Sequence, residues 1–351
     1  MIRKSSFSGA LLMALIFALA ATVFVPAAHA QGKWKQGQPI PQGANEVIGA
    51  AIGNEMLVYG GQDANSKPLG IFYAYDPAKN AWTQLPSNPV PVHHGAAAAV
   101  GRKFYVFGGM RLPDTGKVGW YPEDKAWVFD LASKQWAALP PMPVPSGALT
   151  AVAVGKKIYV NGGAKIPTGT SMPDGLFGGG PVELLAAMQV FDTETNTWSQ
   201  AAPMITPRNH HSLAEVEGKI FSIGGRVGSC FSAGWSANVW MNEEYDIASN
   251  TWRVRAPMPT ARSGTAVAVL NGQIHVLGGE GWIDDFGGVF RAHEVFDPKT
   301  NTWSRATRMI TPRHGFAAGA LGGTIIAVSG VNNAGGTGLL SVVAVNEIFE
   351  P

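Results

Sequence analysis

Short runs of apolar, β-branched and aromatic residues recur along this chain, and each run ends at a pair of small residues. The first run is Met56 to Tyr59, followed by Gly60 and Gly61. The later pairs are Gly108-Gly109, Gly162-Gly163, Gly224-Gly225, Gly278-Gly279 and a degraded sixth copy, Ser329-Gly330. Short runs of this kind bounded by glycine predict β-strands. The pattern therefore predicts an all-β chain built from six similar units.

An acidic turn and a tryptophan follow each of the first five glycine pairs. In the fifth unit the segment runs from Asp297 to Trp303, with Asn301 between them. The corresponding tryptophans of the other units are Trp82, Trp136, Trp198 and Trp252. Asp followed by Pro, Thr or Ala and then Asn favours a hairpin turn between two further strands. The units recur about every 50 residues, a period typical of propeller blades that stack on their neighbours.

This pattern resembles the Kelch-repeat family of β-propellers over essentially the whole chain from Trp34 to Pro351. The resemblance implies a six-bladed propeller in which each blade is a four-stranded antiparallel sheet. The expected blades are 45–86, 93–140, 147–202, 209–257, 263–307 and 314–351 plus 31–41. The resemblance extends more distantly to the Kelch domain of galactose oxidase and to exported sialic acid epimerases.

The two ends of the chain complement each other. The segment from Asn346 to Pro351 aligns with His293 to Pro298, and the chain then stops before a tryptophan-bearing strand. A strand around Trp34 supplies the missing one, so we expect the N-terminal strand to close the sixth blade. Such closure leaves no open sheet edge.

The first thirty residues are typical of a secretory signal peptide. Arg3 and Lys4 precede an apolar run from Leu11 to Val25, and a small-residue cleavage motif ends at Ala30. We therefore expect residues 1–30 to be a signal peptide and residues 31–351 to form one propeller. The expected location is periplasmic or secreted, with no membrane insertion after cleavage.

The charge balance argues against nucleic acid as a partner. The formal net charge is +2, and both Arg3 and Lys4 lie in the expected signal peptide. The remaining chain is close to neutral and has no basic run, so it lacks the electrostatic attraction that nucleic acid binding needs.

Two sets of loops are expected on one face of the propeller, because strand direction alternates within each blade. These are the segments that lead into the innermost strands and the long loops that follow the glycine pairs. Rigid scaffolds usually present function on such loops. The candidate ligand-binding residues on this loop face are Glu46, His94, Trp120, Arg208, His210, Trp235, Arg262, Trp282, Asp284 and Arg313. Tryptophans beside carboxylates suit sugar rings, and arginines suit a carboxylate, although the arginines also fit a structural role between blades.

Histidines also recur at the starts of the innermost strands of alternate blades. His93, His210 and His314 could approach one another around the axis and hold a divalent metal. The alternative is that these histidines cap or hydrogen-bond the loops that carry them. No other cofactor is expected.

The leading interpretation is a non-catalytic recognition propeller of the cell envelope that binds a small glycan or a protein. One alternative is a periplasmic sugar epimerase or mutarotase, with Glu46, Glu280, Asp284, Asp285 and the histidines as acid–base candidates. Another is a metal-dependent enzyme that uses the histidines at the channel mouth. A galactose oxidase activity is less favoured than an epimerase, because the tyrosine–histidine pair that the resemblance requires does not occur.

Overall fold

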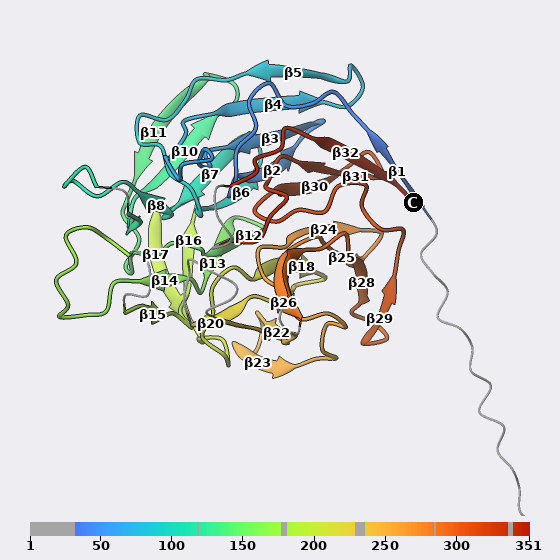
Figure 1. The fold of residues 1–351 in the computed structure, drawn as a ribbon. Coiled ribbons are helices and arrows are strands. Elements are labelled where there is room, and N and C mark those ends of the chain that lie inside the picture. Colours follow the sequence, from blue (N-terminus) through green and yellow to red (C-terminus); the bar gives the residue numbers. More distant parts are fainter. Residues whose placement is uncertain (1–31, 118, 177–180, 229–235, 284–285, 336–339) are drawn as a thin grey trace, which may run out of the picture.

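The fold is a ring of six four-stranded antiparallel sheets around a central axis (Figure 1). The computed structural model describes residues 32–351 except 118, 177–180, 229–235, 284–285 and 336–339. No helix occurs among the residues it describes, and within that part of the chain no helix could span a membrane. The predicted all-β six-bladed propeller is confirmed.

Each blade contains four consecutive main strands, ordered from the axis outward. Blade one holds β2 (Ile48–Ile52), β3 (Glu55–Tyr59), β4 (Phe72–Asp76) and β5 (Ala81–Gln84). Blade two holds β6 (Ala96–Val100), β7 (Lys103–Phe107), β10 (Ala126–Asp130) and β11 (Gln135–Leu139). Blade three holds β12 (Thr150–Val154), β13 (Lys157–Asn161), β16 (Met188–Asp192) and β17 (Thr197–Ala201).

The remaining blades repeat this order. Blade four holds β18 (Ser212–Val216), β19 (Lys219–Ile223), β22 (Asn242–Asp246) and β23 (Thr251–Val254). Blade five holds β24 (Ala266–Leu270), β25 (Gln273–Leu277), β28 (His293–Asp297) and β29 (Thr302–Arg305). Blade six holds β30 (Ala317–Leu321), β31 (Thr324–Val328), β32 (Asn346–Glu350) and, as its outer strand, β1 (Lys33–Gln36).

Four of the long loops form two-stranded hairpins of their own, which the sequence pattern did not predict. They are β8 (Met110–Arg111) with β9 (Tyr121–Pro122), β14 (Ala164–Lys165) with β15 (Glu183–Leu184), β20 (Arg226–Gly228) with β21 (Ser236–Asn238), and β26 (Glu280–Ile283) with β27 (Phe286–Val289). Each hairpin connects the second and third strands of its blade and therefore rises from the loop face.

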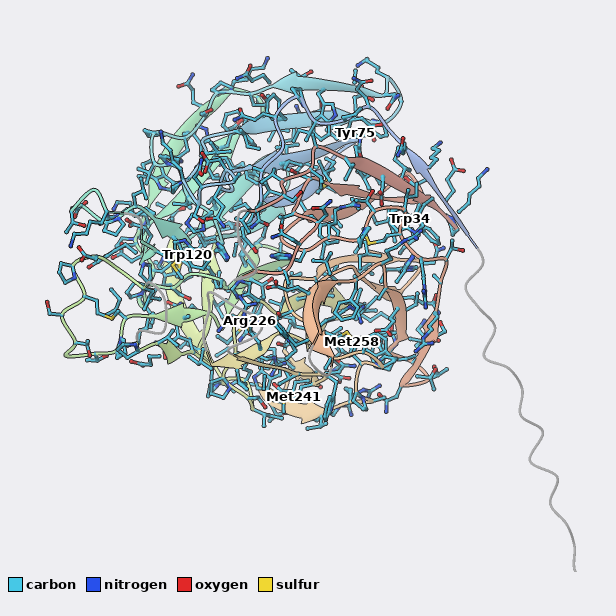
Figure 2. The ribbon with its side chains drawn as sticks, in the orientation of Figure 1. Trp34, Tyr75, Trp120, Arg226, Met241 and Met258 are labelled. Carbon is cyan, nitrogen blue, oxygen red and sulfur yellow. The ribbon has the colours of Figure 1, made fainter. Side chains whose placement is uncertain are left out.

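The N-terminal strand closes the ring as predicted. β1 pairs antiparallel with β32, which places Trp34 opposite Phe349. Trp34 lies at the edge of this blade, where the chain enters it (Figure 2). Its ring packs against His293 of the neighbouring blade at 5.6 Å between centroids. The first described residues and the end of the chain therefore lie in one sheet.

The repeat tryptophans join each blade to the one before it. Every indole N–H donates to a backbone carbonyl just beyond the outer strand of the preceding blade, at 2.7 to 2.9 Å. The series includes Trp82 bonding to Gln38 and Trp34 bonding to Thr307, so it runs completely around the ring. These six bonds form the outer circle of the propeller.

The glycine pairs make a second circle nearer the axis. The second residue of each pair donates its N–H to a carbonyl at the start of the next blade, at 2.8 to 3.0 Å. The first residue has a positive φ, and a Cβ there would crowd that same carbonyl. At Gly278 the added Cβ would lie 2.5 Å from the Arg313 carbonyl oxygen. The glycines therefore allow adjacent backbones to approach closely.

Candidate functional site

A third circle of hydrogen bonds surrounds the channel mouth on the loop face. It passes through the residue that precedes each innermost strand, where φ lies between 52° and 62°. These six residues are Glu46, His94, Ala148, His210, Gly264 and Gly315. Each amide donates to the carbonyl of the preceding blade at 2.7 to 3.3 Å, with Val47 completing the circle onto Gly315. A left-handed backbone suits glycine, so Glu46, His94 and His210 hold a conformation that their side chains disfavour.

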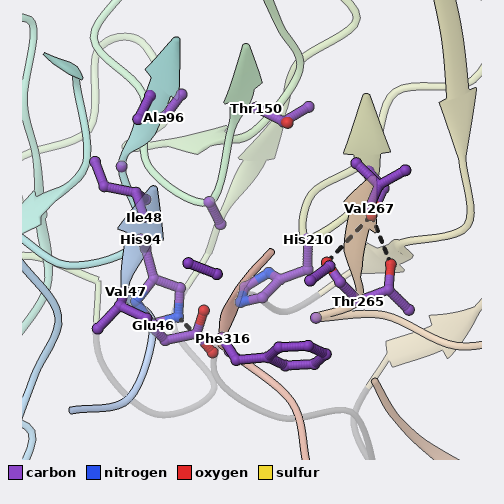
Figure 3. A pocket seen from close by; sticks show the side chains of 18 of the residues that line it. Glu46, Val47, Ile48, His94, Ala96, Thr150, His210, Thr265, Val267 and Phe316 are labelled. Atoms are coloured by element: carbon purple, nitrogen blue, oxygen red, sulfur yellow. Dashed lines mark hydrogen bonds and ion pairs between the residues drawn. The ribbon is translucent and has the colours of Figure 1, made fainter. Parts of the chain in front are cut away.

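These three strained residues direct their side chains toward one another at the axis (Figure 3). The His94 Nε2 atom lies 3.5 Å from Oε1 of Glu46, and the rings of His94 and His210 meet edge to face at 4.9 Å between centroids. One potential ligand atom from each of Glu46, His94 and His210 lies within 4.8 Å of the others. Residues from blades one, two and four therefore converge on one point.

The two glycines of this circle leave room for the converging side chains. A Cβ on Gly315 would lie 2.8 Å from Oε1 of Glu46, and a Cβ on Gly264 would lie 3.2 Å from the His314 ring. A larger residue at Gly315 would displace the Glu46 carboxyl group.

Arg226 and Glu280 form a buried ion pair beside this group, at 2.5 Å between Nη1 and Oε1. Each residue follows a glycine pair directly, and each is at most 2% exposed. His314 Nε2 lies 3.5 Å from Glu280 and 3.6 Å from Glu46. We call Glu46, His94, His210, Arg226, Glu280 and His314 the axial cluster.

The hydrogen bonds define the protonation of His210. Its Nδ1 lies 2.6 Å from the amide oxygen of Asn209, which accepts a hydrogen bond. Its Nε2 lies 3.0 Å from the Arg226 guanidinium, which only donates. The ring is therefore neutral, with the proton on Nδ1. Burial and the Arg226 charge lower its pKa well below the usual value.

Glu46 has the opposite shift. Burial, together with the nearby Glu280 charge, raises the pKa of Glu46 to about 8. For Glu280, burial acts to raise the pKa, but the charges of His314 and Arg226 outweigh it and lower the pKa below the usual value. At neutral pH the cluster therefore holds a protonated Glu46 beside a charged Arg226–Glu280 pair. A perturbed carboxyl of this kind is common at functional sites.

The cluster is covered on the loop side and faces the channel on the other. The Trp120 ring packs 4.5 Å from His94 and 5.1 Å from His93, and it is only 8% exposed. The amide of Gly335 donates to Glu280 Oε2 at 2.6 Å. Below the cluster lies a cavity of about 220 Å³ lined by the innermost strands. Trp120 was expected in a stacking surface for a ligand, and the structure places it in a small core with Met110 and Leu176.

The expected metal histidines are arranged differently from the prediction. His93 and His314 pair through their backbones with the long loops, as the bridges from His93 to Met110 and from His314 to Val331 show. His94, rather than His93, reaches the axis with His210. The side chain of His314 lies against the carboxylates of Glu46 and Glu280.

The three candidate arginines lie inside the blades and away from the channel. Arg208, Arg262 and Arg313 are fully buried. Each forms an ion pair with a glutamate of its own blade, namely Glu243, Glu294 and Glu347 respectively. Each also donates to backbone carbonyls of that blade. In this arrangement the arginines anchor the segment that leads into the innermost strand.

Of the remaining candidates, Trp282 is 43% exposed on the β26–β27 hairpin. Trp235 and Asp284 lie outside the described residues. Of the cluster members, Arg226 was not among the candidates, and Glu280 was named only as an acid–base candidate of the epimerase alternative. The signal that could have found them is their position directly after a glycine pair, where Arg226 pairs with Asn209 and Glu280 with Ser263.

Large exposed apolar side chains occur on the loop face of two adjacent blades and their connections. Among the described residues these are Ile205, Trp240, Val254, Trp282 and Ile310, with exposures from 38% to 70%. All five belong to blades four and five or to the connections beside them. They lie in loops, or at a strand end, that point to the loop face.

Comparison with known proteins gives a consistent picture. The family model described as the KLHDC2/KLHL20/DRC7 Kelch-repeats domain matches residues 27–174 and 174–330. The Kelch-like protein terF of Aspergillus terreus is 27% identical over 91% of this chain and 68% of its own length. Kelch-like protein 15 of Danio rerio is 28% identical over 72% of this chain. The alignment covers 41% of that protein's length, so this chain spans less than half of it.

Proposed function

Because this chain belongs to the Kelch-repeat family of β-propellers, we propose that it is a non-catalytic recognition propeller that binds a protein partner on its loop face. The observation that carries this proposal is the set of exposed apolar side chains on blades four and five. Trp240 is 58% exposed and Trp282 is 43% exposed. Exposed aromatic residues of this kind are enriched where proteins bind partners.

The burial of the axial cluster supports recognition in preference to catalysis. Arg226 and Glu280 neutralise each other, and Trp120 covers His94 from the loop side. A partner that approaches the loop face therefore meets loops and apolar side chains before it meets any titratable group of the cluster.

We also propose that the protein acts in the cell envelope, on the basis of the signal-like residues 1–30. The test is N-terminal sequencing of protein recovered from the periplasmic fraction or the medium. A mature chain that begins at Gln31 supports export. Full-length protein confined to the cytoplasm contradicts it.

The recognition proposal is tested by photo-crosslinking in the envelope of the native host. A photoreactive residue is placed at Ile205 on the loop face or at Lys156 on the opposite face. We expect one defined crosslinked protein from position 205 and none from 156. Trp240→Ala and Trp282→Ala should each reduce its yield at least about tenfold, as removal of a central aromatic residue typically does.

Equal crosslinking from both faces, or a yield that the tryptophan variants do not change, overturns the proposal. A glycan that raises the melting temperature in the wild type and not in Trp282→Ala would instead identify a sugar as the ligand.

A second candidate function is metal binding by Glu46, His94 and His210, which the convergence of their ligand atoms favours. Two histidines and one carboxylate are a common set for zinc or iron(II). The Arg226 guanidinium beside His210 opposes a cation, so this arrangement requires Arg226 to move.

Cobalt(II) absorption and thermal unfolding with zinc test this second candidate. A stabilisation that His94→Asn abolishes and His275→Asn retains supports the site, because His275 is buried elsewhere, in blade five. No effect of either metal contradicts it. Turnover of a sugar by the wild type, lost in Glu46→Gln, would instead support the epimerase alternative.

A further inference from the structure

A cavity of about 690 Å³ opens at the loop-face end of blade five. Arg291, Arg305 and Arg308 line it together with Phe290 and Pro312. Arg291 precedes β28, Arg305 ends β29, and Arg308 lies in the connection to blade six. Its volume falls within the range of pockets that hold small ligands or a few residues of peptide.

The cavity carries a concentrated positive charge. All three arginines are exposed, and among the described residues none of them forms an ion pair within 4 Å. The one carboxylate in the lining, Glu294, is 2% exposed and is already paired with Arg262 and Thr260. Of the guanidinium donors of these arginines, the structure shows one in use, from Nε of Arg291 to the Met309 carbonyl at 2.5 Å. Most of the donors therefore remain available to an anionic ligand.

The other blades show that the fold does not need these arginines. The Met309 amide bonds to the carbonyl of Arg291, and the same bond recurs from Met142, Met204 and Met258. The residues equivalent to Arg291 are therefore Asp124, Ala186 and Trp240. The residues before those methionines, equivalent to Arg308, are Pro141, Pro203 and Pro257. Blades two, three and four thus form the same connection without arginine at these two positions.

We propose that this arginine pocket, defined by Arg291, Arg305, Arg308, Phe290 and Pro312, binds an acidic segment of the protein partner. The inference rests on the proposed function and names the chemistry of the partner. Guanidinium groups pair with carboxylates through two parallel hydrogen bonds. Phe290 and Pro312 offer apolar surface for a neighbouring side chain. The best ligand is therefore a short peptide with two or more carboxylates around one apolar residue.

Exposed Ile310 and Trp282 lie close in sequence to this pocket, on the same face of the same blade. An acidic segment in the pocket would thus belong to the partner whose apolar surface covers these side chains. Charge at the rim of an interface mainly sets the rate and salt dependence of association.

Fluorescence anisotropy tests the pocket directly. The probe is a fluorescein-labelled peptide of four glutamates around a central leucine, and the comparison peptide has glutamine in place of glutamate. We expect the acidic peptide to bind the wild type and the neutral peptide to bind at least about tenfold more weakly. Higher salt should weaken the binding of the acidic peptide, because it screens the attraction between glutamate and arginine.

The double variant Arg305→Gln/Arg308→Gln should lose about tenfold or more in affinity, and Arg291→Gln should lose less because its Nε is already bonded. The matched control is Arg253→Gln, an exposed arginine of blade four whose guanidinium pairs with Glu244. It removes one positive charge outside the pocket, as Arg291→Gln does within it, and should leave the affinity within twofold. Unchanged melting temperatures show that all variants are folded.

Equal binding of both peptides, or an equal loss of affinity in the Arg253→Gln control, overturns the proposal that this pocket binds an acidic segment. Preferential binding of a sulfated oligosaccharide over the acidic peptide also overturns it. If the pocket variants bind normally while Trp240→Ala still loses the crosslinked partner, the pocket fails and the proposed function stands. If the peptide binds only the intact pocket but no protein crosslinks to the loop face, the proposed function fails.

Discussion

At the scale of single residues, the first residue of each glycine pair lies against a backbone carbonyl of the next blade, and so does Ser329, which takes this position in blade six. Five blades have glycine at the first position because a Cβ would meet a carbonyl of the next blade. The sixth blade has Ser329, with φ of 66°, at the seam with blade one. Its hydroxyl accepts from the Ala44 amide and donates to the Ala44 carbonyl, both at 2.8 Å. Side-chain hydrogen bonds thus add to the backbone bond from Gly330 to the Ala44 carbonyl, 3.0 Å long, at this seam.

Substituting Gly278 tests this close approach. In Gly278→Ala the new Cβ lies 2.5 Å from the Arg313 carbonyl oxygen in a left-handed backbone. We expect a loss of about 3 kcal/mol or more in the free energy of unfolding, measured with urea. The control, Gly272→Ala, has a similar φ but open space around its Cβ. It should cost about 1 to 2 kcal/mol. Equal losses would mean that only the backbone conformation matters.

The buried arginine–glutamate pairs give a second prediction. Arg313→Met leaves the Glu347 carboxylate buried without its partner, whose Nη1 lies 2.9 Å away. Removing one partner of such a pair typically costs about 3 to 5 kcal/mol. The double variant Arg313→Met/Glu347→Leu should recover most of that loss. Chemical denaturation of the three proteins provides the test, and a double variant as unstable as the single one contradicts the prediction.

The candidate site could be predicted only partly from the sequence. Glu46, His94 and His210 were identified because they precede the innermost strands. The sequence cannot show which of His93 and His94 turns to the axis, because this depends on a left-handed φ at the second residue and a backbone bridge at the first. The buried role of the three arginines depends on glutamates over 30 residues away, a pairing that no local pattern reveals.

At the scale of strands, the short N-terminal strand both completes the sheet of blade six and joins that blade to blade five. Only four residues of β1 pair with β32, yet Trp34 also bonds to Thr307 and packs against His293. Without β1 the backbone edge of β32 would be exposed, and the outer circle of tryptophan bonds would be broken.

Deleting residues 31–41 should therefore abolish cooperative unfolding, because both the last sheet and the seam with blade five would be incomplete. Calorimetry of the shortened chain provides the test. The control Lys35→Ala removes an exposed ion pair with Glu350 at 2.5 Å and should change stability by less than about 1 kcal/mol. A shortened chain with the wild-type melting transition would contradict this role.

The main strands were predictable because their signals are local and repeat six times. The second strand of each blade ends at a glycine pair, or at Ser329-Gly330 in blade six, and the third strand ends at an acidic residue. Because this pattern occurs six times, a strand that is ambiguous in one copy is identified from the others. The hairpins in the long loops have no such repeat. They form because each loop pairs with itself above the blade, as in β26 and β27, where the pairs are Glu280 with Val289 and Trp282 with Gly287.

At the scale of the whole molecule, burial of histidine makes stability depend on pH. All seven histidines among the described residues are buried, and burial lowers the pKa of each. For His275 the value is about 4 and for His293 about 3. The unfolded chain binds these protons near pH 6.5 and the folded chain does not. The stabilisation is therefore complete above pH 6.5 and is lost as the pH falls toward 4.

Urea unfolding between pH 7 and 4.5 tests this dependence. We expect the free energy of unfolding to fall steeply with acid, at about 1.4 kcal/mol per pH unit for each extra proton bound. Glu46 acts in the opposite direction, because its pKa in the folded chain is raised to about 8. Between pH 7 and 4.5 the folded chain holds this proton more tightly than the unfolded chain, which offsets the loss from about one histidine. His275→Leu should reduce the slope by about one proton. A stability that stays constant down to pH 4.5 would contradict the burial of these groups.

The closed circles of hydrogen bonds have a consequence for chain connectivity. Each seam between blades is made by the same three kinds of contact, including the two seams of blade six, in which β1 and β32 bring the first and last described residues into one sheet. Every blade therefore makes the same kinds of stabilising contact with both of its neighbours. A circularly permuted protein, with residues 32 and 351 joined by a short linker and new ends in an exposed hairpin such as Asn271-Gly272, should fold to the same propeller. The stability of the fold would then depend on the contacts between adjacent blades and not on the blade at which the chain begins.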